Sequence, residues 1–196
     1  MNHASRMATG DTALLVIDVQ EKLLPLIHAA AVVERNIAFL LDAAQLLHVP
    51  VAATEQYPKG LGPTVPELGR RLRGKEQTAL PDKVAFSSCA VESVVDGFHR
   101  DARTRIVLAG IESHVCVLHT ALDLLGLNFR VYVAVDAVGS RYPIDHETAL
   151  RRLEQAGCVP VTSEMCVFEW LASSQHPQFK AVSQLVQARM KAFQPA

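Results

Sequence analysis

Short apolar runs alternate with amphipathic stretches along the chain. The runs predict strands, because each is too short to form a helix. The amphipathic stretches carry apolar residues at helical spacing and predict helices. The expected strands cover residues 14–17, 51–54, 84–86, 105–109, 131–135 and 159–161, and the expected helices cover residues 28–47, 91–100, 114–125 and 146–156, with two more that begin near 163 and 177.

This alternation predicts a parallel sheet with helices on both faces. Right-handed crossovers between successive strands favour a doubly wound topology. The expected fold is therefore a three-layer α/β/α, Rossmann-like domain built on a doubly wound, mainly parallel six-stranded sheet. We expect residues 1–10 to form a flexible N-terminal tail and residues 11–196 to form a single domain.

Composition limits the classes of partner. Of the 196 residues, 49% are apolar and 20% are charged, as in a soluble globular protein, and no apolar run is long enough to cross a bilayer. The net charge of -1 argues against nucleic acid or an anionic membrane as the main partner. The four cysteines form no C-x-x-C pair, which favours reduced thiols and a cytoplasmic location.

Two polar side chains follow neighbouring strands of the expected sheet. Asp18 ends the first strand, and Cys116 follows the fourth. In a doubly wound sheet these strands lie side by side where the strand order reverses, and ligands bind there, beyond the carboxyl ends of the strands. The topology therefore brings Asp18 and Cys116 together, whereas it does not place Lys83, which follows a long loop.

Cys116 is expected in the first turn of a helix, with Ser113 as the N-cap. Unpaired N–H groups and the helix dipole favour a thiolate at that position and could hold an oxyanion beside the sulfur. The alternative is a buried cysteine that acts as a small hydrophobe. Cys166 follows Ser163 at the same spacing, but it comes after the last strand, at a sheet edge, so the topology favours Cys116 as the nucleophile.

Asp18 and Lys83 each have two interpretations. Asp18 is either a cap beyond the strand or a general base, and burial would raise the pKa of this carboxyl unless a cation compensates. Lys83 is the candidate cation, and the alternative is a solvated lysine at a strand end.

Other catalytic patterns are missing from the sequence. There is no H-E-x-x-H motif and no pair of histidines after a strand, so we expect no metal. The first strand is followed by neither G-x-G-x-x-G nor a P-loop, and the nucleophile elbow G-x-S-x-G is absent. We therefore expect no cofactor, no dinucleotide site of the usual kind and no serine nucleophile.

With Asp18, Lys83 and Cys116 in this order, the chain resembles the isochorismatase-like cysteine hydrolases. The resemblance extends from the first strand to the C-terminal helix. It rests on LVIDVQ at 15–20, KVAF at 83–86 and GIESHVCV at 110–117. Two further segments, TEQYPKGLG at 54–62 and HPQFK at 176–180, resemble the isochorismatase domain-containing subgroup, whose substrates are poorly defined.

The resemblance implies a catalytic triad in which Asp18 takes the proton of Cys116, and Lys83 stabilises the resulting ion pair. Cys116 then attacks a carbonyl and forms a thioester, which water hydrolyses. The resemblance also implies an oxyanion hole at the backbone N–H groups of Glu112 and Cys116, a cis peptide bond between Ile111 and Glu112, and a homo-oligomer. Four residues lie next to the matched motifs and are expected to bind substrate: Gln20, Gln56, Tyr57 and Phe86.

The chain departs from the nicotinamidases of this family, which bind a metal through an aspartate and histidines after the second strand. Residues 54–57 read TEQY there. Cys116 favours acyl chemistry, so the expected activity is metal-independent hydrolysis of an amide-like C–N bond in a small metabolite. Two alternatives remain: an isochorismate-type vinyl ether hydrolase that uses Asp18, and a catalytically silent binding or scaffold protein.

Overall fold

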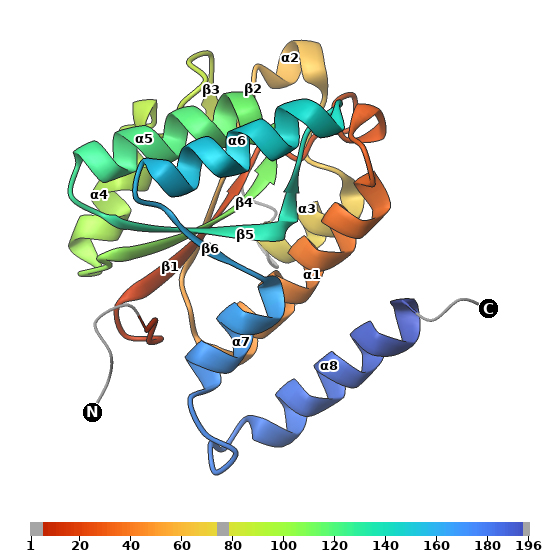
Figure 1. Ribbon diagram of the computed structural model, residues 1–196, viewed down its shortest axis with the longest axis vertical. Coiled ribbons are helices and arrows are strands. Elements are labelled where there is room, and N and C mark those ends of the chain that lie inside the picture. Colours follow the sequence, from red (N-terminus) through yellow and green to blue (C-terminus); the bar gives the residue numbers. More distant parts are fainter. Residues whose placement is uncertain (1–5, 74–78, 194–196) are drawn as a thin grey trace.

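Six parallel strands form a central sheet in the computed structural model, which describes residues 6–73 and 79–193 (Figure 1). The strands are β1 (Thr12–Ile17), β2 (Val51–Gln56), β3 (Asp82–Lys83), β4 (Arg105–Ile111), β5 (Arg130–Gly139) and β6 (Val159–Val161). Their order is β3-β2-β1-β4-β5-β6, and each neighbouring pair is parallel. The chain order reverses between β1 and β4, which confirms the doubly wound, Rossmann-like topology.

Helices cover both faces of this sheet and complete the three-layer α/β/α fold (Figure 1). The helices are α1 (Ala30–Leu47), α2 (Pro58–Leu61), α3 (Pro66–Leu72), α4 (Glu92–Arg100), α5 (Leu118–Gly126), α6 (Pro143–Gln155), α7 (Ser163–Leu171) and α8 (Phe179–Phe193), with short turns η1 (Leu24–Leu26), η2 (Ser88–Ala90) and η3 (Ser113–Val117). On one face, α1, α3, α7 and α8 share an apolar cluster with Leu14 and Val16. On the other face, α4, α5 and α6 pack with Ala13 and Leu15. All six residues of β1 are buried, as expected for a strand covered on both sides.

The third strand differs from the prediction. We expected residues 84–86, but β3 is Asp82–Lys83, and the side chains of Val84 and Phe86 are 81% and 53% exposed. This strand lies at the sheet edge and pairs with the last two residues of β2. The chain then leaves the sheet, so the apolar residues at 84 and 86 point outward instead of pairing. β5, in contrast, is longer than predicted: it continues to Gly139, past its expected end at residue 135.

The N-terminal segment is partly attached to the body of the protein. Residues 1–5 of the expected tail lie outside the described residues. Met7 is 1% exposed, and its backbone N–H donates to Oε2 of Glu169 in α7 at 2.7 Å. The described end of the segment therefore packs into the core.

Gly110 allows β1 and β4 to approach closely at the end of β1. It pairs with Ile17, and its backbone φ is +119°, a conformation that L side chains rarely adopt. A Cβ at this position would lie 2.1 Å from the carbonyl oxygen of Ile17 and 2.6 Å from its nitrogen. Because Asp18 directly follows Ile17, the position of Asp18 depends on a residue without a side chain at 110.

We expect Gly110→Ala to lower the free energy of unfolding by more than about 3 kcal/mol, because the backbone of β1 would have to move. Urea unfolding followed by circular dichroism measures this loss. Gly126→Ala is the control, since a Cβ there meets nothing within 4 Å. We expect it to change stability by less than about 1 kcal/mol, in the stabilising direction. Similar losses for the two variants would contradict the close approach.

Candidate active site

The site begins at Asp18, the first residue after β1. Its backbone φ of 54° is left-handed, which aspartate tolerates better than most residues. Its side chain is 0% exposed. Nζ of Lys83 lies 2.6 Å from Oδ2, and the hydroxyl of Thr54 donates to Oδ1 at 2.9 Å. A charge taken out of water requires partners of this kind, and Asp18 has them on both oxygens.

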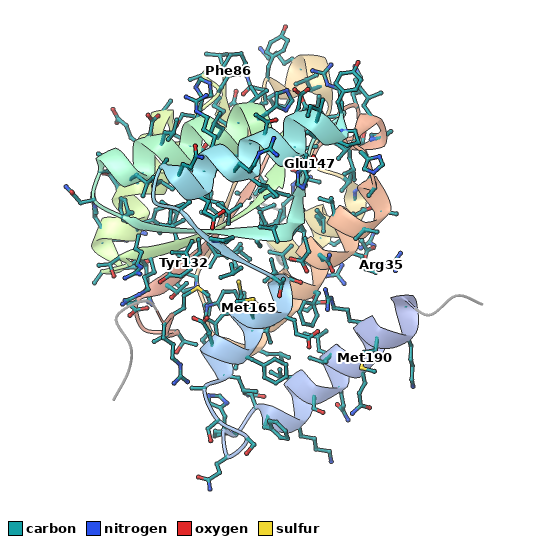
Figure 2. All side chains as sticks on the ribbon, viewed as in Figure 1. Arg35, Phe86, Tyr132, Glu147, Met165 and Met190 are labelled. Atoms are coloured by element: carbon teal, nitrogen blue, oxygen red, sulfur yellow. The ribbon has the colours of Figure 1, made fainter. Side chains whose placement is uncertain are left out.

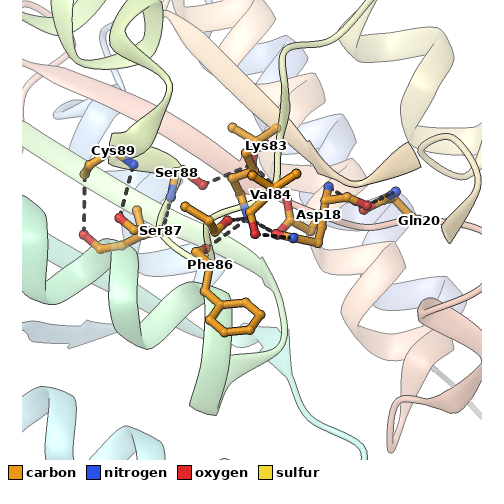
Figure 3. A network of polar contacts seen from close by, with 12 residues as sticks. Asp18, Gln20, Lys83, Val84, Phe86, Ser87, Ser88 and Cys89 are labelled. Carbon is orange, nitrogen blue, oxygen red and sulfur yellow. Dashed lines mark hydrogen bonds and ion pairs between the residues drawn. The ribbon is translucent and has the colours of Figure 1, made fainter. Parts of the chain in front are cut away.

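Lys83 ends β3, and its side chain is 1% exposed. Its ammonium donates to Asp18, to Oε1 of Gln56 at 2.7 Å, and to the carbonyl oxygens of Phe86 at 2.9 Å and Ala85 at 3.3 Å. The chain bends sharply after β3 and returns these two carbonyls to the lysine (Figure 3). Lys83 is therefore a buried, bonded cation and not a solvated lysine at a strand end.

Gln20 and Gln56 lie in supporting positions. The amide of Gln20 is fully buried and donates to the carbonyls of Gln56 at 3.0 Å and Gly62 at 2.6 Å. Its oxygen accepts from the backbone N–H of Gln56 at 2.7 Å. The side chain of Gln56 joins the ammonium of Lys83 to the carbonyl of Val84, at 2.9 Å. Both amides thus hold the segments that carry the buried ion pair.

Tyr57 and Phe86 lie at the rim of the site, and each is 53% exposed. Phe86 is at the periphery of the molecule, above the carboxyl ends of the strands (Figure 2). Its ring forms a T-shaped contact with the ring of His119, with ring centroids 5.8 Å apart. These two aromatic side chains are free to contact a ligand, which the buried Gln20 is not.

Ser113 does not cap the cysteine-bearing helix. The residue at the N-cap is Glu112, and Cys116 lies in η3, a π-helical turn that precedes α5. The hydroxyl of Ser113 bonds instead to Nδ1 of His146 in α6 at 3.0 Å. The predicted cap is wrong because a serine at N1 and a serine at the N-cap look alike in sequence.

The π-turn changes the hydrogen bonding of the cysteine backbone. In an α-helix the carbonyl of Glu112 would accept from the N–H of Cys116, four residues later. Here that carbonyl accepts from Val115 and Val117, each at 3.1 Å. Such turns are often found at functional sites. The peptide bond between Ile111 and Glu112 is cis.

Asp18 and Lys83 both act on the pKa of the Cys116 thiol, so the structure brings their side chains close to the sulfur. Burial, and then the negative charge of Asp18, raises the pKa of Cys116 to about 12, although Lys83 opposes the shift. The thiol is therefore protonated at rest, in contrast to the thiolate that the helix position suggested. Burial also raises the pKa of Asp18 above its usual value, while Lys83, Cys116 and Thr54 lower it. A more basic carboxylate in contact with a thiol is suited to accept its proton.

The other cysteines lie in different surroundings. Burial raises the pKa of both Cys89 and Cys158 to about 11, and it raises that of Cys166 further. Burial alone shifts the pKa of Cys158, and the negative charges of Asp136 and Glu169 add to the effect of burial at Cys166. Cys116 differs from both in having a carboxylate and an ammonium close enough to act on its pKa.

Sequence reasoning missed several residues of this region. Thr54 lies in the buried part of β2. Ser88 lies in η2, and its hydroxyl oxygen is 3.0 Å from that of Thr54. Arg141 follows β5 and donates through Nε to Oε1 of Glu112 at 2.9 Å, which ties this loop to the cysteine loop. Thr54 could have been noticed at the carboxyl end of a strand. Ser88 could not, because its neighbour Ser87 is identical in sequence and only caps η2.

Within residues 6–73 and 79–193, no group of three or more His, Cys, Asp or Glu side chains is placed to hold a metal ion. The arrangement offers acid–base and nucleophilic chemistry from the buried cluster of Asp18, Lys83 and Cys116.

Comparisons with known proteins agree with this fold. The family model "Isochorismatase domain" matches residues 12–165. Isochorismatase domain-containing protein 2 of Bos taurus is 41% identical over 182 residues, which cover 92% of this chain and 85% of that protein. The solved structure of MAR1 ribonuclease from Caenorhabditis elegans is 39% identical, covers 93% of each chain and has a TM-score of 0.86. YcaC of Escherichia coli, described as an octameric hydrolase of unknown specificity, is 22% identical with a TM-score of 0.81, covers 98% of this chain and 100% of its own, and shows the fold alone.

Replacing Lys83 by methionine tests the buried ion pair. Because burial raises the pKa of Asp18, the folded protein keeps a proton there at pH values at which the unfolded chain has released it. Stability therefore falls as pH rises through that window, and loss of Lys83 widens the window. We expect Lys83→Met to reduce the free energy of unfolding by about 3–5 kcal/mol near pH 8 and by clearly less near pH 5, in urea titrations.

Lys22→Met is the matched control, because this exposed lysine donates to the Gly60 carbonyl. Its effect should stay within about 0.5 kcal/mol at both pH values. A loss in Lys83→Met that does not change with pH would contradict a buried carboxylate stabilised by Lys83.

Proposed function

Because the chain belongs to the isochorismatase family of hydrolases, we propose that it is a metal-independent cysteine hydrolase. It cleaves an amide-like C–N bond of a small metabolite through a thioester on Cys116. The observation that supports this most is the convergence of Asp18, Lys83 and Cys116 from three separate segments into one buried cluster, in which Asp18 and Lys83 form an ion pair beside the thiol.

In the first half-reaction, the thiol proton of Cys116 passes to Asp18 as the sulfur attacks the carbonyl carbon. Lys83 remains positively charged, so it pairs first with the carboxylate and then with the developing thiolate. The carbonyl oxygen becomes an oxyanion, which the backbone N–H groups of Glu112 and Cys116 hold. Collapse of this intermediate breaks the C–N bond, and the amine leaves with the proton from Asp18.

In the second half-reaction, Asp18 takes a proton from water, and the hydroxide attacks the thioester carbon. The C–S bond breaks, the acid is released, and the proton returns to the sulfur. Tyr57 and Phe86 are our proposed substrate contacts at the rim. A general base of this kind supplies about 10²–10⁴-fold acceleration, and one oxyanion donor supplies about 10²–10³-fold.

Two other activities follow from specific observations. The raised pKa of Asp18 suits an acid that protonates a vinyl ether, as an isochorismate-type hydrolase requires. The similarity to MAR1 ribonuclease of Caenorhabditis elegans makes RNA a second candidate substrate. The net charge of -1 provides no excess of positive charge for a polyanion, so we favour the small acyl substrate.

Self-association and location are further proposals. Exposed apolar side chains follow the carboxyl ends of several strands, including Tyr57 and Val84, together with Tyr142 and Ile144 at the start of α6. A second copy of the chain would cover them, and YcaC of Escherichia coli is described as octameric. No helix within the described residues combines the length and hydropathy needed to cross a membrane. We propose a cytoplasmic homo-oligomer.

The thioester can be tested with p-nitrophenyl acetate as a probe. We expect the protein to release p-nitrophenol and to carry one acetyl group on Cys116, detected by mass spectrometry of acid-quenched samples. Cys116→Ala should abolish the adduct and the turnover, and Asp18→Asn should lower kcat/KM by about 10²–10⁴-fold. Cys158→Ala, which removes another buried thiol, should leave both unchanged.

The alternatives give different results. Hydrolysis of isochorismate that survives Cys116→Ala but not Asp18→Asn would replace the acyl mechanism with the vinyl ether one. Cleavage of RNA that depends on the same residues would change the substrate class. Turnover of none of these substrates, together with no adduct, would favour the binding or scaffold protein.

A further inference from the structure

Three buried hydroxyl side chains are connected to the carboxylate of Asp18 through hydrogen bonds. Thr54 in β2 is 1% exposed, and Ser88 in η2 and Thr120 in α5 are 0% exposed. A hydroxyl group in an apolar interior costs free energy unless it is hydrogen-bonded. Each of the three has a hydrogen-bond partner in this cluster, which offsets that cost. We therefore ask what the cluster does for Asp18.

The two bonds between side chains in this cluster both point toward Asp18. Thr54 donates its single hydroxyl proton to Oδ1 of Asp18 at 2.9 Å. Its oxygen lies 3.0 Å from that of Ser88, and since Thr54 has no second proton, Ser88 must be the donor. The backbone N–H of Ser88 donates in turn to Oγ1 of Thr120 at 2.8 Å, which fixes Ser88 against α5.

The adjacent serine provides a contrast. The hydroxyl of Ser87 accepts from the backbone N–H of Cys89 at 3.2 Å and caps η2, a local structural role. The hydroxyl of Ser88 is directed instead toward Thr54, an interaction with a residue 34 positions earlier. Figure 3 shows the two serines beside the network that contains Asp18 and Lys83.

We propose that Thr54 and Ser88 are positioning residues, whose two hydroxyls form a chain of donors that ends on Asp18, keeps this buried carboxylate charged and prevents it from rotating. The inference rests on the proposed function, in which Asp18 accepts the proton of Cys116. Hydrogen bonds to a charged form favour that form. Thr54 holds one carboxylate oxygen and Lys83 the other, so the base is ionised and oriented before the thiol proton arrives.

The groups that act on Asp18 come from each element around it. Lys83 of β3 and Cys116 of η3 are the ionisable neighbours, and Thr54 of β2 is the uncharged donor; all three favour the charged carboxylate against its burial. Removal of the Thr54 hydroxyl therefore changes one contribution and leaves both ionisable neighbours in place.

The test uses the alkylation of Cys116 by iodoacetamide, which needs no knowledge of the substrate. The sulfur forms a bond to the methylene carbon, iodide leaves with its electron pair, and the thiol proton passes through Asp18 to water. The rate constant, from mass spectrometry of the peptide that contains Cys116, should rise with pH as Asp18 loses its proton. The pH at the midpoint of this rise is the quantity compared between the wild type and the variants.

We expect Thr54→Val to move the midpoint to higher pH by about half a pH unit or more. The variant loses a hydrogen bond that stabilises the charged carboxylate, so Asp18 keeps its proton to a higher pH. Thr54→Ser, which restores a hydroxyl, should return it to the wild-type value. Ser88→Ala should move it in the same direction but less. The double variant T54V/S88A should match T54V alone, because Ser88 acts through Thr54.

Thr12→Val is the matched control. Thr12 is also a fully buried threonine on a strand, and it donates to a carboxylate, Oδ1 of Asp11 at 3.0 Å, at the opposite end of β1. It should leave the midpoint unchanged. A midpoint in T54V equal to that of T12V, or a shift in T54S as large as in T54V, would overturn the proposal.

Asp18→Asn separates this inference from the function on which it rests. If this variant retains the wild-type pH dependence, Asp18 is not the base and the proposed function fails. If the alkylation rate of this variant no longer rises with pH, and the midpoint of T54V equals that of the wild type, Asp18 is the base but Thr54 and Ser88 do not position it. Should T54V not fold, S88A still decides, because a purely structural role of Ser88 lowers the melting temperature without moving the midpoint.

Discussion

The ion pair between Asp18 and Lys83 is the constraint on which the rest of the site depends. Two opposite charges are fully withdrawn from water, and their separation of 2.6 Å recovers the desolvation cost only if their remaining donors and acceptors are also bonded. The surroundings meet this condition. Gln56 and two backbone carbonyls bind the ammonium, and Thr54 binds the carboxylate. Three strands must therefore be in register before the pair can form.

The same constraint explains the chemistry assigned to Cys116. A thiol beside a carboxylate is harder to ionise, and the structure raises its pKa instead of lowering it. In the proposed mechanism the nucleophile is thus not stored as a free thiolate. There it becomes a thiolate when its proton moves to Asp18, and Lys83 stabilises the negative charge in either location. A resting site of this kind protects the sulfur from adventitious reaction.

The sequence predicted the fold well, because the fold follows from topology. Alternation of strands and helices determines the doubly wound sheet, and the sheet brings the ends of β1 and β4 together, with Asp18 and the cysteine loop. Topology does not place Lys83, since a long loop separates it from β2. It was a candidate because a buried carboxylate needs a cation, and its role in a triad came from the family resemblance. The roles of Gln20, Ser88 and Ser113 depend on side-chain directions within irregular segments, which no periodicity encodes. The apolar residues 84 and 86 misled for a related reason: hydrophobicity predicts burial, and these residues are exposed at the rim.

The short length of β3 has a consequence for how this protein is inactivated by heat. The strand that carries Lys83 is two residues long, lies at the edge of the sheet and pairs with two residues of β2. Edge segments with few pairings open at a lower free-energy cost than the core. Local fraying of this strand would withdraw the cation while the central strands stay folded. Catalytic competence would then disappear earlier than global structure during warming, and inactivation would be reversible on cooling.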